Sequence, residues 1–407
     1  MTMARWIGLA LVLLCGGVSI WWGASTGLTW FGGPLDFQAI YSATQCLLQH
    51  HNPYVENLYV NLPTTFIFIA PFAMLPLGVA QALWMILLTG VFILAAFLMW
   101  KIGASYAPGV SLFLICILLA NSEVLFATGN SAGIVVGLCV VAVWCFLQER
   151  FVWAGILCLA ASLAFKPHDA GLVWLYFLLA GGVYRKRALQ TLMLTVVLSL
   201  SALLWVWQVA PYWMPEWQSN LSAISAHGGL NDPGPASVTG RTAGMVIDLQ
   251  AAVSVIRDDP RIYNPASYLV CGALLLAWSV RTLRSRFSRR RAWLALAAIV
   301  PLTMLVTYHR PYDAKLLMLA VPACAMLWAE GGAIAWTALM VTTAGLALTA
   351  DIPLAILVIF TRDLSINTAS LSGQMLKAVL TRPTPLILLL MGAFYLWLYL
   401  RREPERG

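Results

Sequence analysis

Long apolar runs, separated by short polar turns, recur along this chain and constrain its fold more than any other feature. Of its 407 residues, 61% are hydrophobic and 10% are charged, whereas a typical soluble domain is about 25% charged. So little polar surface cannot cover a globule in water. The composition also excludes a disordered, collagen-like or coiled-coil chain. The sequence therefore predicts an all-α polytopic membrane protein.

A helix needs about 20 apolar residues to cross a membrane, and about 17 at the short end. Segment 7–23 follows Arg5 as a signal peptide would, but Trp21 and Trp22 stand where small residues should precede a cleavage site. We therefore interpret it as an uncleaved first span of a single integral membrane domain, residues 1–407. About twelve spans are expected, near 7–23, 81–100, 108–126, 131–147, 152–165, 170–184, 189–210, 266–284, 292–308, 314–329, 332–350 and 384–401.

The basic residues predict how the spans are oriented. One side of the predicted membrane holds Arg5, Lys101, Arg150, the cluster Arg185-Lys186-Arg187, the six Arg between positions 281 and 291, and the Arg-containing tail. Loops rich in Lys and Arg stay in the cytoplasm, so both termini are expected there. This loop charge accounts for the net charge of +8 without nucleic acid. The expected location is the plasma membrane, and a bacterial inner membrane fits best.

This orientation places three long segments, 24–80, 211–265 and 351–383, outside the cytoplasm, together with all five His. Within the first, the apolar stretch 63–76 is short and is interrupted by Pro71. We expect it to be re-entrant or to lie in the membrane plane, because such backbone is tolerated where protein or a cavity surrounds it.

The same first loop contains DFQAIYSATQCLLQHHNPY, from Asp36 to Tyr54. Residues 36–49 have an amphipathic helical pattern, which predicts an in-plane helix. Asn52-Pro53 then ends the helix. Asp36 is placed as an N-cap, which is a purely structural role. An acidic residue that opens an in-plane helix directly after the first span is also a candidate for catalysis.

Three outer turns carry further polar groups: TGNSAG (128–133), LAFKPHDA (163–170) and TYHRPYDAKLL (307–317). The first has a simple interpretation as a tight turn of small residues. In the second, Lys166 could extend to the interface and pair with Asp169, or it could bind a lipid-borne phosphate. The third is too dense in polar groups for a mere connector. Ionisable groups at a membrane indicate function or a partner.

Taken together, these motifs resemble the polyprenyl-phosphate-mannose-dependent α-1,2-mannosyltransferase-like family, glycosyltransferase family 87 of the C-type glycosyltransferase superfamily. The resemblance covers about residues 7–330 and consists of degenerate motifs in the expected order. They are Asp36 with Tyr41, Asn52-Pro53-Tyr54, the segment 63–76, Gly129-Asn130, Lys166-Pro167 and Tyr308 to Pro322. The chain departs from the pattern at His50-His51, where Gly is frequent, and at Asn130, where Gln is more usual.

The resemblance implies an enzyme that takes a sugar, typically mannose, from a polyprenyl-phosphate carrier on the extracytoplasmic face and inverts its anomeric configuration. Asp36 would be the general base for the hydroxyl of a lipid or glycan acceptor, and membrane lipids would surround the protein. Cations would stabilise the leaving phosphate. The candidates are Lys166, His309 and Arg310 for the phosphate, and Tyr41, Tyr54, Asn130, His168 and Tyr312 for the substrates. No cofactor and no metal ion are expected, because no acidic pair lies beside Asp36 and no Cys/His spacing typical of zinc is present.

The main alternative is a membrane transporter or flippase of a lipid-linked or polar solute. It would place ionisable groups in mid-membrane and often relates two halves of the chain by a repeat. The sequence shows no such repeat, and its polar residues gather at one face. A lipid-linked ligase of another fold, with key bases in loop 211–265, and a structural membrane partner also stay open.

Overall fold

The computed structural model describes residues 3–56, 59–237, 246–361, 366 and 370–401. Within these residues every regular element is a helix and there is no strand, which confirms the all-α class. The first half of the chain forms α1 (Met3–Phe31), α2 (Leu35–Leu48), α3 (Pro53–Glu56), α4 (Thr64–Ala73), α5 (Leu77–Gly103), α6 (Pro108–Ala120), α7 (Glu123–Thr128), α8 (Ala132–Leu147), α9 (Val152–Phe165), α10 (Pro167–Ala180) and α11 (Gly182–Val209).

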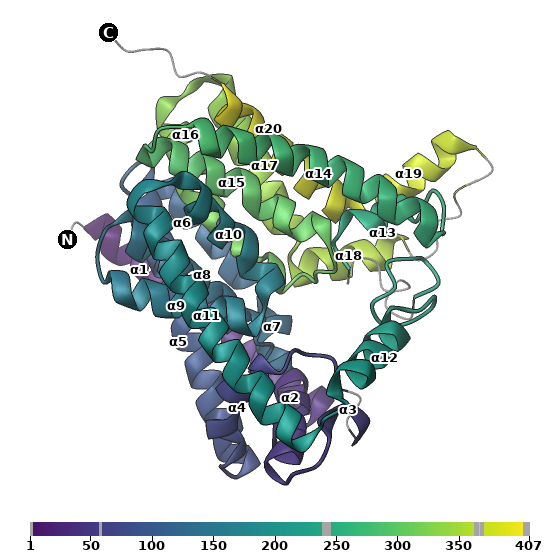
Figure 1. Cartoon of the computed structure of the whole chain (residues 1–407). Coiled ribbons are helices and arrows are strands. Elements are labelled where there is room, and N and C mark those ends of the chain that lie inside the picture. The colour runs from purple at the N-terminus through teal and green to yellow at the C-terminus, as the bar shows by residue number, and fades with distance from the viewer. Residues whose placement is uncertain (1–2, 57–58, 238–245, 362–365, 367–369, 402–407) are drawn as a thin grey trace.

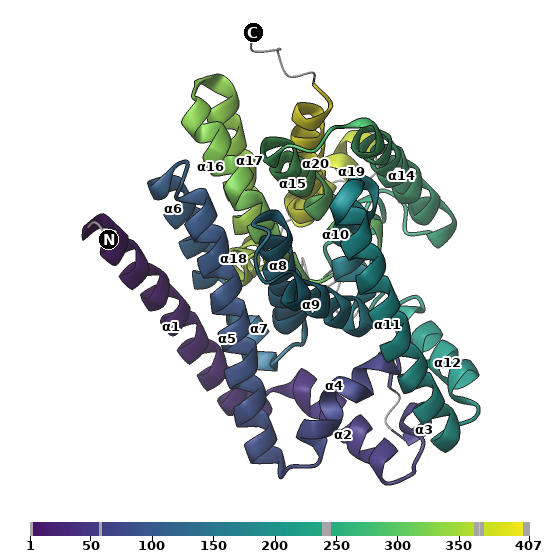
Figure 2. The same ribbon diagram turned by 60° about the vertical axis from the view of Figure 1, so that its left-hand side comes forward.

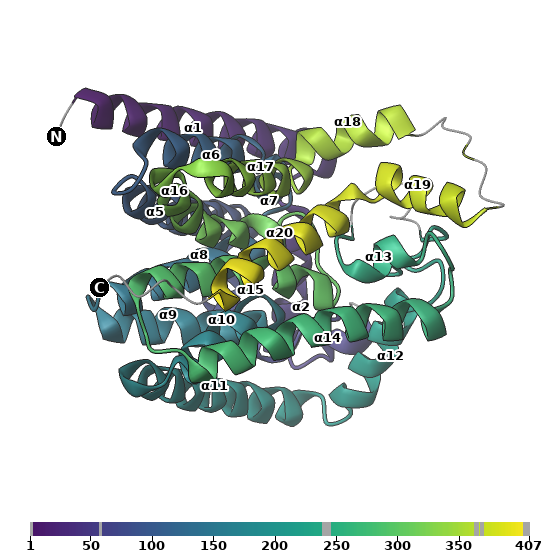
Figure 3. The same ribbon diagram turned by 90° about the horizontal axis from the view of Figure 1, so that it is seen from above.

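The second half adds α12 (Trp213–Ser225), α13 (Leu249–Val253), α14 (Pro260–Arg284), α15 (Arg289–Val306), the 3₁₀ helix η1 (Asp313–Ala320), α16 (Val321–Glu330), α17 (Gly332–Leu348), α18 (Asp351–Thr361), α19 (Leu371–Thr381) and α20 (Pro383–Leu400). The longer helices form a bundle (Figure 1). In the view from above, α1 and α11 lie at opposite edges, with α8 and α15 between them (Figure 3). The most extensive helix contacts join α15 to α20 and α8 to α9.

Every expected span overlaps a helix or a pair of consecutive helices, but the count of twelve spans is not confirmed. Among the described residues, five helices are long and apolar enough to cross a membrane, namely α1, α5, α11, α14 and α20, and the bent pair α17–α18 would make six. Helices α8 and α9 have 16 and 14 residues, or about 24 and 21 Å at 1.5 Å per residue. These lengths are below the roughly 30 Å of a bilayer core.

The predicted in-plane helix and the segment after it pack together at one end of the bundle (Figure 2). Helix α2 matches the expected range 36–49 and buries the side that includes Phe37, Ile40 and Tyr41. Helix α4 covers most of 63–76 and has only 10 residues, or about 15 Å. That length agrees with a segment that does not cross. The Tyr41 hydroxyl donates to the Leu75 carbonyl at 2.7 Å, which ties α2 to the end of α4.

The opposite end of the bundle carries the starting end of α1 and the final end of α20 (Figures 1 and 2). Lys101, Arg150 and Arg289 line one cavity of about 300 Å³. These three basic residues come from the end of α5, the α8–α9 turn and the start of α15. The structure thus gathers part of the predicted cytoplasmic charge in one place, away from α2 and α4.

Gly129 positions the turn between α7 and α8 against α2. It ends α7 in the left-handed region, with a φ of 62°. A Cβ atom at this position would lie 2.6 Å from the Pro34 Cβ. The Gly129 carbonyl also accepts a hydrogen bond from the Trp84 indole at 2.8 Å. Only glycine meets both the backbone and the packing requirement, so it sets the distance between α2 and Asn130.

We expect Gly129→Ala to lower the stability of the protein by about 1–3 kcal/mol, the range for a non-glycine residue held in a sparsely populated backbone region. Thermal unfolding of the purified protein in detergent would measure the change. Gly90→Ala is the matched control, because Gly90 is in α5 and a Cβ atom added there would meet nothing within 4 Å. Equal melting temperatures for the two variants would contradict this interpretation of Gly129.

Candidate active site

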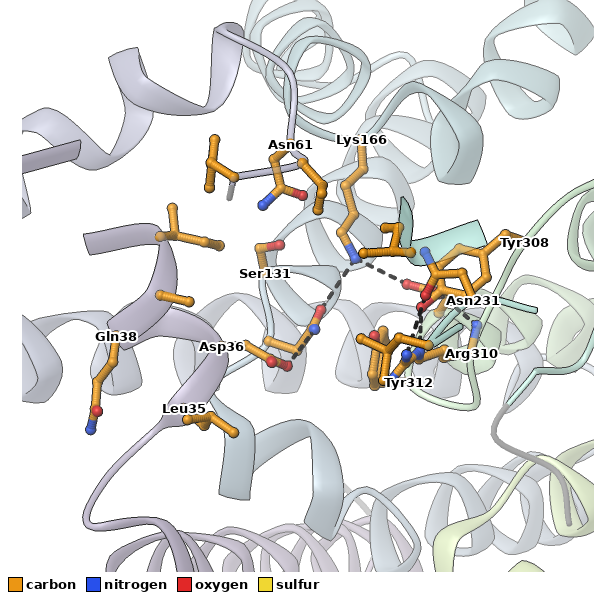
Figure 4. A pocket seen from close by; sticks show the side chains of 18 of the residues that line it. Leu35, Asp36, Gln38, Asn61, Ser131, Lys166, Asn231, Tyr308, Arg310 and Tyr312 are labelled. Atoms are coloured by element: carbon orange, nitrogen blue, oxygen red, sulfur yellow. Dashed lines mark hydrogen bonds and ion pairs between the residues drawn. The ribbon is translucent and has the colours of Figure 1, made fainter. Parts of the chain in front are cut away.

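A cavity of about 620 Å³ lies beside α2 and is lined by side chains from distant parts of the chain (Figure 4). The lining residues fall within 35–42 of α2, 59–61, 130–131, 166–168, 224–231 and 308–313. All three polar turns singled out in the sequence therefore contribute to one cavity, together with the predicted in-plane helix.

Asp36 lines this cavity and does not cap α2, so the expected N-cap role is wrong. Pro34 occupies the N-cap position, no side chain caps this terminus, and Asp36 belongs to the first turn of the helix. The Asp36 Oδ2 atom instead accepts a hydrogen bond from the Asn130 side-chain amide at 2.7 Å. Because its other oxygen accepts no hydrogen bond from the described residues, the carboxylate can accept one from a molecule in the cavity.

The interaction continues from Asn130 to Lys166 and Asp313. The Asn130 Oδ1 atom accepts from the Lys166 ammonium at 3.2 Å, and the same ammonium donates to the Asp313 carboxylate at 3.2 Å. The expected partner Asp169 is therefore replaced by Asp313, which is 147 residues away. Burial works against the charge of Lys166, but Asp313 and Asp169 outweigh it and the pKa of Lys166 is raised. Lys166 thus stays a cation, with 14% of its side chain exposed.

Arg310 supplies the second cation, and its position depends on the turn around it. Its backbone N–H donates to the Asp313 carboxylate at 2.8 Å. Its guanidinium donates to the Tyr308 hydroxyl and, at 3.4 Å, to the Asn231 side chain. In the close view, Arg310 lies across from Asp36 (Figure 4). The cavity therefore places the Asp36 carboxylate across from Arg310, and Asn130 links the same carboxylate to the Lys166 ammonium.

The two histidines of the prediction occupy different places. His168 lines the cavity, and 35% of its side chain is exposed. His309 does not line it: its side chain is fully buried, and its ring lies 5.1 Å from the ring of His168. Burial disfavours the charged form of His309, but the adjacent Asp169 outweighs this effect and raises its pKa. Because its side chain is buried and does not line the cavity, His309 is not placed to contact a substrate phosphate.

Of the five predicted substrate contacts, Asn130, His168 and Tyr312 line the cavity, whereas Tyr41 and Tyr54 do not. Tyr41 turns toward α4, as described above. The Tyr54 ring packs against Tyr59 and Trp213 in the core. Sequence reasoning did not propose Tyr59, Asn61, Ser131, Asn231 and Tyr308, which line the cavity instead. Asn231 belongs to the turn NDPGP, whose composition indicates a loop but not its direction.

The geometry defines the general class of the protein: a helical membrane protein with a carboxylate and two cations around a cavity sized for a small ligand. The sequence model of glycosyltransferase family 87 matches residues 59–307, and the chain belongs to that family. The match includes Asn130 and Lys166 and leaves Asp36 and Arg310 outside. No curated protein and no solved structure gave a match. Family membership favours a glycosyltransferase over the transporter alternative.

We expect Asp313→Asn to destabilise the protein by about 3 kcal/mol, because removing one partner of a buried ion pair leaves the other charge unpaired. Thermal unfolding in detergent would measure it. The exposed pair His51–Glu56, at 2.9 Å, offers the control. Glu56→Gln should change stability by less than about 1 kcal/mol. Similar small effects for both variants would show that Asp313 does not hold Lys166 and the turn at Arg310 in place.

Proposed function

We propose that the protein is an inverting glycosyltransferase that moves a sugar, with mannose as the first choice, from a polyprenyl-phosphate carrier to a hydroxyl of a lipid or glycan. The observation that carries this proposal is the cavity that Asp36, Lys166 and Arg310 line together, with Asp36 across from Arg310. Family membership supports the transfer of a sugar. The anionic leaving group, the lipid carrier and the identity of the base are our inferences from the charges.

In this mechanism the acceptor oxygen attacks the anomeric carbon of the sugar. The bond between that carbon and the phosphate oxygen breaks, and the electron pair leaves with the polyprenyl phosphate. Asp36 takes the proton of the acceptor hydroxyl. Its Oδ2 atom is held by Asn130, which leaves Oδ1 for the acceptor. Attack from the side opposite the leaving phosphate inverts the configuration.

The charge that develops on the phosphate needs stabilisation in a place with little water. Lys166 and Arg310 are suited to this role, because both line the cavity. Asp313 accepts hydrogen bonds from the Lys166 ammonium and from the backbone N–H of Arg310. Arginine can bind phosphate with two parallel hydrogen bonds, and lysine acts as a compact charge. Tyr59, Tyr308 and Tyr312 also line the cavity and offer flat apolar surfaces beside hydroxyl groups for a sugar ring. The transfer changes no oxidation state and therefore calls for no redox cofactor.

A polyprenyl chain is supported by the membrane character of the protein, since five of the described helices are long and apolar enough to cross a membrane. We propose that the cavity opens at the extracytoplasmic face of the plasma membrane. The support is the gathering of Lys101, Arg150 and Arg289 at the other end of the bundle, as the cytoplasmic side should be positive.

We expect Asp36→Asn to reduce sugar transfer by about 100-fold or more, the usual contribution of a general base. The substitution keeps the size of the side chain and removes its ability to take a proton. Membranes that contain the protein would receive radiolabelled polyprenyl-phosphate mannose and an extract of membrane lipids, and labelled products would be separated and counted. Asp258→Asn is the matched control, since Asp258 is exposed and is not among the residues that line the cavity.

Equal transfer by the Asp36→Asn and Asp258→Asn variants, at equal protein levels, would contradict the role of Asp36. If the wild type used a nucleotide sugar and none of several polyprenyl-phosphate sugars, the proposed donor class would be wrong.

We expect Arg310→Lys to lower the maximal rate of transfer by about 10-fold to 100-fold. This decrease is somewhat smaller than the decrease caused by removing a charge-stabilising donor entirely. The lysine keeps the charge but loses the paired hydrogen bonds of arginine. The Michaelis constant for the acceptor should stay unchanged, because the proposed acceptor site is at Asp36. Steady-state kinetics with purified protein would separate these quantities. An unchanged rate, with only the acceptor constant altered, would place Arg310 on the acceptor side.

A further inference from the structure

Three metal-ligand side chains converge just behind the cavity, between the α9–α10 turn and the turn that carries Arg310. They are His168 and Asp169, from the first turn of α10, and His309. One potential ligand atom from each lies within 4.8 Å of the others. The Asp169 Oδ1 atom is 3.5 Å from Nε2 of His309 and 3.9 Å from Nε2 of His168. Tetrahedral zinc with bonds of about 2.1 Å separates its ligand atoms by about 3.4 Å.

The hydrogen bonding of His309 turns its second nitrogen into a potential ligand. Its Nδ1 atom lies 2.8 Å from the Thr307 carbonyl oxygen. A carbonyl can only accept, so Nδ1 carries the hydrogen and Nε2 faces Asp169. This use of a backbone carbonyl to fix the ring is the usual arrangement around histidine ligands of metals.

A neutral His309 would point the lone pair of Nε2 at the Asp169 carboxylate, and two acceptors repel unless a positive charge lies between them. One solution is a proton, which would give an ion pair. A hydrogen bond between an imidazolium and a carboxylate usually measures about 2.7–2.9 Å. The distance of 3.5 Å is longer than that and fits a metal ion bound by both groups.

Asp169 gives independent support. Its side chain is fully buried, and neither of its oxygens has a hydrogen-bond partner among the described residues. A buried carboxylate without donors is costly. The partly exposed His168 would complete three protein ligands and leave the fourth position for water or another ligand, as in many zinc sites. Two imidazoles and a carboxylate suit zinc better than magnesium or calcium, which favour oxygen ligands alone.

We propose that His168, Asp169 and His309 bind one Zn²⁺, which joins the turn of Lys166 to the turn of Arg310. The ion would fix the positions of Lys166 and Arg310 relative to each other and would neutralise the charge of Asp169. The sequence led to the expectation of no metal, because no acidic pair lies beside Asp36 and no Cys/His spacing typical of zinc is present. Zinc binding itself does not depend on the proposed sugar transfer, so the two proposals can fail separately.

The zinc content of the purified protein tests this proposal. The protein would carry no His tag, would be treated with a chelator and would then be dialysed against micromolar Zn²⁺ before metal analysis by mass spectrometry. We expect about one Zn²⁺ per chain, the stoichiometry of a site with three protein ligands. His168→Ala and Asp169→Asn should each remove most of it. His51→Ala is the control, since His51 forms an exposed pair with Glu56, and it should keep the zinc.

A second measurement keeps the proposal testable if Asp169→Asn does not fold. Added Zn²⁺ should raise the melting temperature of the wild type and leave that of His168→Ala unchanged. Substituted Co²⁺ should show the visible absorption of a four- or five-coordinate ion in the wild type alone. A wild type without bound zinc and without a shift in melting would overturn the proposal. So would zinc that is lost only on His227→Ala, since His227, Asp232 and Asp258 form another cluster.

Discussion

The candidate site depends on one line of hydrogen bonds that runs from Asp36 through Asn130 and Lys166 to Asp313. Each member fixes the next: the amide of Asn130 holds the carboxylate and the ammonium at once, and Asp313 holds Lys166 and the backbone of Arg310. The four residues belong to four separate segments. Because an unpaired buried charge is costly, the line ties the assembly of the site to the packing of the helices.

Much of the fold could be predicted because apolar periodicity reports helices directly. The range of α2 and the short length of α4 follow from the sequence. The number of spans does not, because an apolar run of 14 residues is equally consistent with a buried helix and with part of a span. Helices such as α8 owe their apolar character to burial inside the bundle, where most of their side chains are enclosed.

The site could be predicted only in part. Local composition singled out Asp36, Lys166 and Arg310, and the structure places all three on one cavity. Local composition could not pair Lys166 with Asp313, because the two residues are 147 positions apart and only the tertiary fold brings them together. Tyr41 is five residues from Asp36, so on a helix the two side chains face different directions. Tyr41 belongs to the apolar side of α2, and its side chain is buried against the protein and does not line the cavity. The same long-range packing brings His309 to Asp169, which no spacing rule could reveal.

The most direct test of the proposed site is a structure of the protein with a polyprenyl-phosphonate analogue of the donor, determined by electron microscopy in a lipid nanodisc. We expect phosphonate oxygens at about 3 Å from the Lys166 ammonium and the Arg310 guanidinium, with the sugar between them and Asp36. A phosphonate bound away from both cations, or a sugar that points away from Asp36, would contradict the proposed roles of these residues.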